Sequence, residues 1–330
     1  MDTYVHQLLT DNPVQPAAPP DLNNTQPGPG TGDTPARPQA LARPQARRHP
    51  ALRSILVAIL RSALAATLRA AGAARPTEHL ATRAAHSAFA ARLAGHGTVR
   101  VRRLGATFTL DLADNVQRTL YLTGTYEPDF LRFLQSELRV GDIYADIGAH
   151  VGIDAVVAAH RVGRSGHVYA FEPAADTSAR LDAVTRSFEN VTIVNLALGA
   201  TSTTVDLRAD PSFQAGDASA RSLFTQGTVI CRVPMTTLDI WAEDLPRLDL
   251  AKIDIEGGEY DAIAGMQRTL ARLRPRAVVV EIEASRLHLA GRTKQDIFRL
   301  LLDTGYAPSG EAFLDNVVFR RRPLPTDPPS

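Results

Sequence analysis

A chain of 330 residues, of which 44% are hydrophobic and 22% charged, is long enough for one large α/β domain with extensions. Its single cysteine, Cys231, excludes an intrachain disulfide and is typical of a reducing, cytoplasmic setting, and its cysteine and histidine residues lack the spacing of zinc ligands. The formal net charge of +1 conceals an uneven distribution, because residues 51–103 carry nine arginines against one acidic residue, whereas residues 104–330 carry 23 basic and 30 acidic residues.

The two ends of the chain are predicted to be disordered. Residues 1–50 are rich in proline and nearly free of aromatic side chains, so this segment buries too little apolar surface to offset the entropy of ordering it. We expect a second disordered tail over residues 323–330.

Residues 51–72 are predicted to form one amphipathic helix, because their apolar side chains recur at helical spacing. Arg53, Arg61 and Arg69 interrupt the segment, so no apolar run approaches the roughly 20 residues that a spanning helix needs. A secretory signal is not expected either, since the segment follows fifty proline-rich residues. Three interpretations of the helix stay open: it packs on the domain, lies on an anionic membrane surface, or contacts an acidic partner.

This helix opens an extension, residues 51–125, that is expected to precede the main domain. Residues 97–110 and 117–123 alternate apolar and polar positions, which predicts a hairpin. Residues 127–140 then predict a helix.

The main domain, residues 126–322, is predicted to be a doubly wound α/β domain. From residue 141 a strand, a glycine-containing turn and a helix repeat along the chain, which indicates a parallel sheet with helices on both faces. The predicted strands occupy residues 143–147, 167–171, 191–196, 250–255 and 277–282, and the predicted helices occupy residues 151–161, 175–188, 258–273 and 294–304.

Two further segments complete the predicted domain. A final strand over residues 313–320 is expected to pair back at the edge of the sheet. Residues 197–249 are too long for a simple crossover and contain strand candidates at 203–207 and 229–234. Inserted beside the carboxyl edge of the sheet, they are expected to shape a substrate pocket.

A short glycine-containing segment, residues 146–152, joins the first predicted strand of the sheet to its helix. Gly148 permits a tight turn and the close approach of a ligand, and the helix offers unpaired N–H groups at its N-terminus. This architecture is typical of a nucleotide-cofactor site, although an ordinary turn between strand and helix shares the pattern. His150 replaces the second glycine of the dinucleotide fingerprint, which argues against NAD or FAD.

Glu172 follows the second predicted strand, 24 residues after Gly148. An acidic side chain at this place can accept two hydrogen bonds from the 2′,3′-diol of a ribose, as in adenosine cofactors. A surface carboxylate at a strand end is the alternative interpretation.

Three charged residues interrupt the fourth core strand, where a central strand of a parallel sheet should be apolar. Lys252, Asp254 and Glu256 alternate along the chain and would face one side, which is costly unless they pair or bind something. A structural ion pair between Lys252 and Asp254 is one interpretation, and a role at the carboxyl edge of the sheet is preferred. Glu281 could meet Lys252 across the sheet and Glu283 could line the acceptor site, unless both are solvated strand ends.

Four blocks of the sequence resemble the FkbM family of class I methyltransferases: Asp146-Ile-Gly-Ala-His-Val-Gly, Phe171-Glu-Pro, Asn195-Leu-Ala-Leu-Gly and Lys252-Ile-Asp-Ile-Glu-Gly-Gly-Glu. They occur in the order and at the spacing of that family, within residues 120–305. The resemblance implies a seven-stranded Rossmann-like sheet with a reversed last strand, S-adenosylmethionine as methyl donor, and O-methylation of a natural product, sugar or glycan.

The same resemblance implies roles for individual residues. Asp146, Gly148 and Gly152 would hold the methionine end of the cofactor, Glu172 its ribose, and Asn195 to Ala197 would lie near the adenine. His150 would be a loop residue that contacts the cofactor, since members of the family commonly carry Asn or His there.

Transfer of a sulfonium methyl group to an alcohol requires alignment of donor and acceptor and a group that takes the proton of the acceptor. Asp254 is the first candidate for this base, followed by Glu256, Glu259 and His150. A divalent metal held by Asp254 and a neighbouring carboxylate could instead lower the pKa of the hydroxyl. The sequence offers no clear set of three ligands, so no metal site is predicted.

Two other classes of function stay open. The missing glycine opposes an NAD(P)-dependent oxidoreductase. A non-catalytic adapter would keep the cofactor and use the basic residues 51–103 to bind a membrane surface or an acidic partner. Nucleic-acid binding is not expected, because Phe89 is the only aromatic residue of that basic segment. The sequence identifies neither the acceptor nor the oligomeric state.

Overall fold

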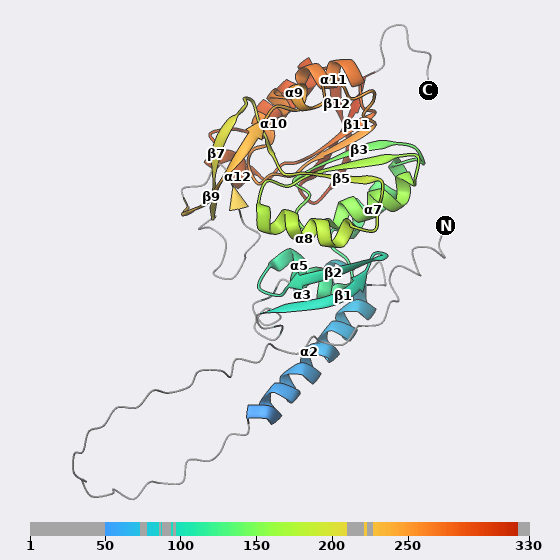
Figure 1. Cartoon of the computed structure of the whole chain (residues 1–330), viewed down its shortest axis with the longest axis vertical. Helices are drawn as coiled ribbons and strands as arrows, with labels where there is room; N and C mark the ends of the chain where they lie inside the picture. Colours follow the sequence, from blue (N-terminus) through green and yellow to red (C-terminus); the bar gives the residue numbers. More distant parts are fainter. Residues whose placement is uncertain are drawn as a thin grey trace, which may run out of the picture.

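The computed structural model describes residues 50–72, 78–85, 87, 94, 97–209, 221–222 and 227–322. The two predicted disordered tails lie outside these residues, apart from Pro50. The fold is a seven-stranded mixed sheet between two helical layers, a smaller second sheet, and an N-terminal extension on one side (Figure 1).

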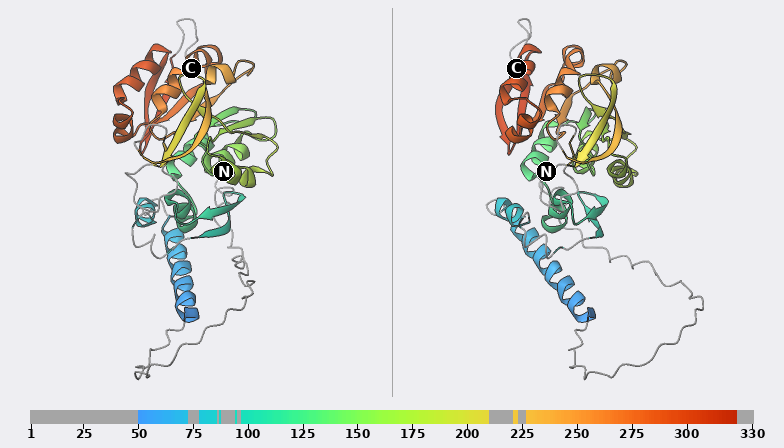
Figure 2. Two further views of the ribbon diagram at one scale, coloured as in Figure 1. Left: turned by 60° about the vertical axis from the view of Figure 1, so that its left-hand side comes forward. Right: turned by 90° about the vertical axis from the view of Figure 1, so that its left-hand side faces the viewer.

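The predicted N-terminal helix is confirmed as α2 (Pro50–Gly72), which projects from the rest of the molecule in both views of Figure 2. Its C-terminal half packs against α3 (Glu78–Ala85) and α5 (Asn115–Thr123) and buries Ala65 and Leu68 there. The apolar side chains in this half of the helix are therefore buried by packing against the rest of the extension. Among the described helices, none is long and apolar enough to cross a membrane.

The N-terminal module, residues 97–126, contains the predicted hairpin and one helix that was not predicted. Strands β1 (Thr98–Arg103) and β2 (Ala106–Asp111) pair antiparallel, as expected for residues 97–110. The prediction of strand for residues 117–123 is wrong, because they belong to α5. Asp114 caps this helix by accepting a hydrogen bond from the backbone N–H of Gln117, and this local cap outweighs the alternating pattern.

The main sheet has the strand order β12-β13-β11-β10-β3-β4-β5, and β13 runs antiparallel to both of its neighbours. This arrangement confirms the seven-stranded sheet with a reversed strand. Its strands are β3 (Ile143–Ile147), β4 (His167–Phe171), β5 (Val191–Val194), β10 (Leu250–Ile253), β11 (Ala277–Glu281), β12 (Tyr306–Phe313) and β13 (Asn316–Arg321).

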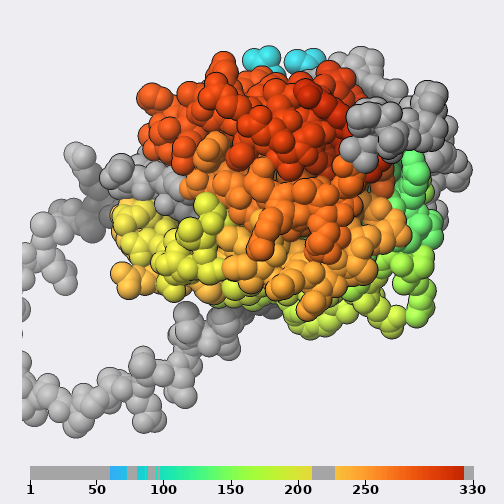
Figure 3. Space-filling model, turned by 90° about the horizontal axis from the view of Figure 1, so that it is seen from above, coloured from blue at the N-terminus to red at the C-terminus, as the bar shows by residue number. Residues whose placement is uncertain are grey.

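Helices cover both faces of this sheet, as the alternating rhythm predicts. Among the described residues, one face packs against three helices and against the N-terminal module, and the other packs against five helices. The helices of the first face are α6 (Pro128–Glu137), α7 (Ile153–Val162) and α8 (Ala175–Thr185), and those of the second are α9 (Leu238–Trp241), α10 (Glu259–Ala264), α11 (Gln267–Leu273), α12 (Ala284–Leu289) and α13 (Lys294–Asp303). Seen from above in Figure 3, the C-terminal part of the chain, coloured orange to red, forms most of the visible surface.

The inserted segment forms a second sheet of order β6-β9-β7-β8. Both predicted strands are confirmed within β7 (Thr203–Ala209) and β9 (Val229–Thr236). The two short strands β6 (Ala197–Leu198) and β8 (Arg221–Ser222) were not predicted.

Two predictions about the C-terminal half need correction. The helix predicted over residues 258–273 is broken between α10 and α11 at Gly265, where a Cβ atom would lie 2.0 Å from the carbonyl oxygen of Gly199. The predicted final strand exists as β13, but it lies inside the sheet, and the unpredicted β12 forms the edge. A short helix, α12 (Ala284–Leu289), follows β11.

Candidate active site

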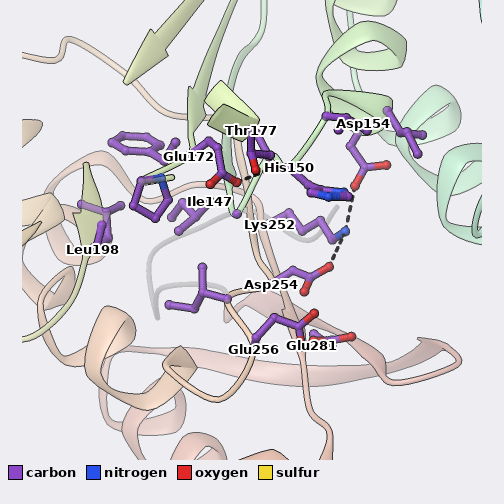
Figure 4. Close-up of a pocket in the computed structure, with 18 of the residues that line it drawn as sticks. Ile147, His150, Asp154, Glu172, Thr177, Leu198, Lys252, Asp254, Glu256 and Glu281 are labelled. Carbon is purple, nitrogen blue, oxygen red and sulfur yellow. Dashed lines mark hydrogen bonds and ion pairs between the residues drawn. The ribbon is translucent and has the colours of Figure 1, made fainter. Parts of the chain in front are cut away.

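A cavity opens at the carboxyl ends of β3, β4 and β10, the place where open α/β sheets bind ligands. Figure 4 shows its polar side chains gathered around this edge. Its wall comes from the turn after β3 and the start of α7, the ends of β4, β10 and β11, the start of α8, the second sheet, and the N-terminal module. The lining includes Val116, Tyr126, Gly148, His150, Asp154, Glu172, Ala197, Leu198, Lys252, Asp254, Glu256 and Glu281.

The turn after β3 has the left-handed backbone that its glycines predict. Gly148 has φ +93°, His150 +48° and Gly152 +89°. A Cβ atom at Gly148 would lie 1.8 Å from the carbonyl oxygen of Asp254, and one at Gly152 would lie 2.6 Å from Cδ1 of Leu181. Gly148 is therefore required by its contact with backbone as well as by its conformation, whereas the terminal methyl group that faces Gly152 can move, so Gly152 is favoured mainly by its left-handed backbone.

The carboxylate of Glu172 is fixed at the tip of β4. It is 8% exposed, and its oxygens accept hydrogen bonds from the backbone N–H groups of His150 at 3.1 Å and Ala174 at 2.9 Å. The side chain of Asn195 donates hydrogen bonds to the carbonyl oxygens of Glu172 and Pro173, at 2.7 and 3.1 Å. Asn195 thus supports the backbone below the carboxylate, while Glu172 itself lines the cavity.

Asp146, the first residue of the turn segment, is buried behind the cavity wall and is 1% exposed. Its Oδ2 has no hydrogen-bond partner among the described residues. Burial, with the negative charge of Asp154 as a second cause, raises the pKa of Asp146 to about 8. The carboxyl group therefore holds its proton at neutral pH.

Lys252 lies at the centre of a buried ion-pair cluster. Its ammonium nitrogen is 2.7 Å from Oδ2 of Asp154 and 2.9 Å from Oδ2 of Asp254 (Figure 4), and it lies 4.7 Å from the ring centroid of Phe130. Burial opposes its charge, but the carboxylates of Asp154, Asp254 and Glu127 outweigh it and hold the pKa of Lys252 well above its usual value. The sequence interpretation of an ion pair with Asp254 is confirmed, and the pair also lines the cavity.

Asp254 and Glu281 form a pair of carboxyl groups with opposite protonation. Burial raises the pKa of Glu281 well above its usual value, and the charge of Asp254 adds to the effect. Burial opposes ionisation of Asp254 too, but the charge of Lys252 and a hydrogen bond from Glu281 hold its pKa below the usual value. Glu281 therefore donates its proton to the carboxylate of Asp254, and its partner is Asp254 instead of the predicted Lys252.

Glu256 and Glu259, the next two candidate bases, differ in position. Glu256 has a left-handed backbone with φ +62°, lines the cavity and pairs with Arg286. Burial and the charge of Asp254 raise its pKa to about 8, although Arg286 opposes this shift. Glu259 lies outside the cavity lining, where its Oε1 accepts hydrogen bonds from the backbone N–H groups of Ile255 and Gly257, both at 3.1 Å. The structure therefore places Glu259 in the support of the loop.

Glu283, expected to line the acceptor site or to be solvated, pairs with Arg286 and bonds the hydroxyl of Ser285 outside the cavity lining. His150 is held by a residue that sequence reasoning missed, because its Nε2 lies 3.3 Å from Oδ2 of Asp114.

Several other residues of the site were missed because they are distant in sequence from the motifs. Asp154 is in the first turn of α7, and Tyr126 ends the N-terminal module. Burial and the charge of Glu127 raise the pKa of Tyr126 well above its usual value. Burial raises the pKa of Glu127 to about 7 against the effect of Lys252.

Within the described residues, no group of three or more histidine, cysteine, aspartate or glutamate side chains could hold a metal ion.

The features of the cavity fit an adenosine-containing ligand. A carboxylate at the tip of β4 can accept hydrogen bonds from a ribose, and apolar side chains of Ile147, Phe171 and Leu198 form a wall on which a base can lie. The narrow turn at Gly148 lets a ligand approach the backbone at the start of α7.

Comparison with known proteins identifies the main domain. The family described as "Methyltransferase FkbM domain" matches residues 146–308. A curated relative, the hexuronic acid methyltransferase AglP of Haloferax volcanii, is 27% identical over 198 residues, which are 59% of this chain and 75% of the relative.

Comparison with solved structures matches a methyltransferase FkbM from Methylobacillus flagellatus, with 14% identity and a TM-score of 0.38. The match covers 62% of this chain and 53% of that protein, so the chain spans about half of its length. Fibrillarin from Aeropyrum pernix, solved with natively bound S-adenosyl-L-methionine, is 16% identical with a TM-score of 0.36 and covers 58% of this chain and 73% of its own.

Proposed function

We propose that this chain, whose residues 146–308 are a methyltransferase FkbM domain, is an S-adenosylmethionine-dependent enzyme that methylates a hydroxyl oxygen of a sugar or glycan. The observation that carries the proposal is the juxtaposition in one cavity of an adenosine-type site at Glu172 and the buried pair of Asp254 with Lys252. The domain match favours methyl transfer over a nicotinamide-dependent oxidoreductase and over a non-catalytic adapter.

The residues around the turn would hold the cofactor. Gly148, His150 and Gly152, with Asp146 behind them, would border its methionine end, and Glu172 would accept hydrogen bonds from its ribose. The segment from Asn195 to Ala197 would lie near the adenine. S-adenosylmethionine would supply an electrophilic methyl group on a sulfonium.

Asp254 is the residue that we propose to act on the acceptor. It is ionised, lines the cavity, and is held by Lys252 on one side and by Glu281 on the other. Its carboxylate can accept a hydrogen bond from a hydroxyl and take its proton as the oxygen gains the methyl group. Because the low pKa of Asp254 makes it a weak base, alignment of the hydroxyl is expected to contribute more than proton affinity.

The charges of the cavity favour a hydroxyl over a carboxylate as the methylated group. Among the lining residues, the carboxylates of Asp154, Glu172 and Asp254 outnumber the ammonium of Lys252, so an anionic group of the acceptor would be repelled from the reacting position. Burial raises the pKa of Glu256 and of Glu281, and neither is needed for this excess of negative charge. The curated relative is named for a hexuronic acid, which carries hydroxyls and a carboxyl group. We infer a sugar acceptor that presents a hydroxyl to Asp254.

The test uses purified full-length protein, S-adenosylmethionine labelled in the methyl group, and two sets of acceptors, uronic acids and neutral sugars. A methyl ether on a sugar hydroxyl survives mild alkali, whereas a methyl ester on a carboxyl group does not. Label that persists after alkali supports the proposal. Label released by alkali would place the transfer on a carboxyl group, and absence of transfer to either set of sugars would contradict a sugar acceptor.

Two finer points also stay proposals. The single cysteine Cys231, which is free in the structure, supports a reducing, cytoplasmic setting. The basic residues 51–103 are proposed to meet an anionic membrane surface or an acidic partner, which salt-dependent association would test.

A further inference from the structure

The N-terminal module contacts the turn after β3 through a buried residue, Asp114. This residue precedes the matched domain by 32 positions, follows β2 and caps α5. It is 1% exposed, and its two oxygens accept hydrogen bonds from the backbone N–H and the side-chain amide of Gln117, at 2.9 and 2.8 Å. Gln117 is itself buried and accepts a hydrogen bond from the backbone of Asp111. The direction of the Asp114 carboxylate is therefore fixed from within the module.

Asp114 faces His150, whose Nε2 lies 3.3 Å from Oδ2 of the aspartate. His150 adopts a left-handed backbone with φ +48°, a conformation that is uncommon for a residue with a side chain and is held only by its surroundings. In this conformation its backbone N–H donates to Oε2 of Glu172. A continuous path thus runs from Asp114 through His150 to the carboxylate proposed to bind the ribose.

The module does not need this pair in order to dock. Val101, Phe108, Leu110 and Leu120 of the module share one apolar cluster with Val151 and Leu181 of the main domain. Apolar burial of this kind suffices for docking, whereas a buried carboxylate costs free energy unless it is paired. Apolar contacts already join the N-terminal module to the main domain. The pair of Asp114 and His150 is therefore not needed for docking and must have another role.

We propose that Asp114 is a positioning residue for the cofactor: by holding the ring of His150 it fixes the turn 148–152 and the carboxylate of Glu172 in the arrangement that binds adenosine. The inference rests on the proposed function and makes the N-terminal module part of the binding site. Burial lowers the pKa of the His150 ring, but Asp114, with Glu172 and Glu256 as further acidic residues, outweighs burial and raises this pKa above its usual value.

The experiment measures binding of S-adenosylhomocysteine by calorimetry to full-length wild type, Asp114→Asn, His150→Gln and the double variant. Asp114→Asn is expected to weaken binding on the order of tenfold, a size typical of coupling between linked sites. The double variant is expected to bind no more weakly than His150→Gln, because both changes break the same path. The matched control is Asp182→Asn, the same chemical change at an exposed residue that pairs with Arg186 and does not contact His150, and it is expected to bind like wild type.

A second readout separates positioning from simple loss of structure. In NMR titrations of labelled protein the pKa of the His150 ring is expected to fall in Asp114→Asn and to stay unchanged in Asp182→Asn. If Asp114→Asn does not fold, His150→Gln decides: a folded variant that binds as tightly as wild type overturns the inference. Equal binding by a folded Asp114→Asn, or additive losses in the double variant, also overturns it. Absence of binding by wild type would instead contradict the proposed function.

Discussion

A Cβ atom added to Gly148 would lie 1.8 Å from the carbonyl oxygen of Asp254, so the turn after β3 is in direct contact with the end of β10. The turn carries the proposed cofactor contacts, and the strand end carries the candidate base. Because no side chain fits between them, the two halves of the site have a fixed spacing.

Gly148→Ala is expected to lower both stability and affinity for S-adenosylhomocysteine, because the backbone of Asp254 must move to admit a methyl group. Gly305→Ala is the matched control, since Gly305 has a similar φ of +90° but nothing within 4 Å of an added Cβ. The control should lose about 1 kcal/mol from left-handed strain alone, and Gly148→Ala should lose about 3 kcal/mol or more. Urea denaturation measures the loss in free energy of unfolding for each variant. Equal losses would show that the backbone of Asp254 moves at little cost.

Glu172→Ala should weaken binding of S-adenosylhomocysteine on the order of 100-fold, since hydrogen bonds to a charged group contribute about 1.5–3 kcal/mol each. Calorimetry compares it with Glu189→Ala, which removes an exposed carboxylate that pairs with Arg164. Wild-type affinity in Glu172→Ala would remove Glu172 from the ribose site.

Asp254→Asn should reduce turnover by about 100-fold or more while changing affinity for S-adenosylhomocysteine by only about threefold, because proton transfer is lost and the cofactor contacts remain. Methyl transfer from labelled cofactor gives the first quantity, and calorimetry gives the second. The exposed Asp182, paired with Arg186, supplies Asp182→Asn as the control. Unchanged turnover in Asp254→Asn would show that this residue does not act as the base.

Lys252→Met should lower the free energy of unfolding by about 3–5 kcal/mol, since it leaves the carboxylates of Asp154 and Asp254 buried without their cation. The double variant Lys252→Met/Asp154→Asn should recover part of this loss, because one uncompensated charge is removed. Urea denaturation near neutral pH measures each value. A loss below about 1 kcal/mol would mean that the cluster is solvated in solution.

Glu259→Gln tests the pH dependence of stability. Burial raises the pKa of Glu259 to about 7 in the folded state, against 4.5 for an ordinary glutamate, so the folded state binds this proton more tightly. Its contribution is fully present below pH 4.5 and is lost as the pH rises through 7, by at most about 3 kcal/mol. The variant should therefore gain stability relative to wild type between pH 4.5 and pH 8, because Gln has no proton to lose.

Urea denaturation at both pH values measures this gain. Glu243→Gln, a change at an exposed residue, should leave the free energy of unfolding unchanged at both pH values. A constant difference between Glu259→Gln and wild type would contradict the raised pKa.

Much of the main sheet was predictable from the sequence because local signals agree there. β3 and β4 have the predicted bounds, since each is short, largely apolar and followed by a turn. Where a distant contact decides, the prediction was wrong. Gly265 breaks the long helix because the backbone of Gly199 passes against it, and α5 forms because Asp114 caps it.

The motif residues of the site were predictable from the sequence, whereas the side chains that contact them were not. Gly148, Glu172 and Asp254 follow strands whose carboxyl ends share one edge, so their meeting follows from topology. Asp154 and Tyr126 come from a helix and from the N-terminal module, and nothing in their own neighbourhoods marks them as polar contacts of Lys252 or as cavity wall. The protonation of Glu281 likewise depends on burial beside Asp254, which only the folded chain creates.

The position of β13 has a consequence for how the enzyme is made. The strand lies between β12 and β11, although both precede it in the sequence. A nascent chain that has not yet reached residue 316 exposes two strand edges, and such edges readily pair with other chains. The sheet can therefore be completed only after residue 321 has left the ribosome. Until then the incomplete sheet is prone to aggregation.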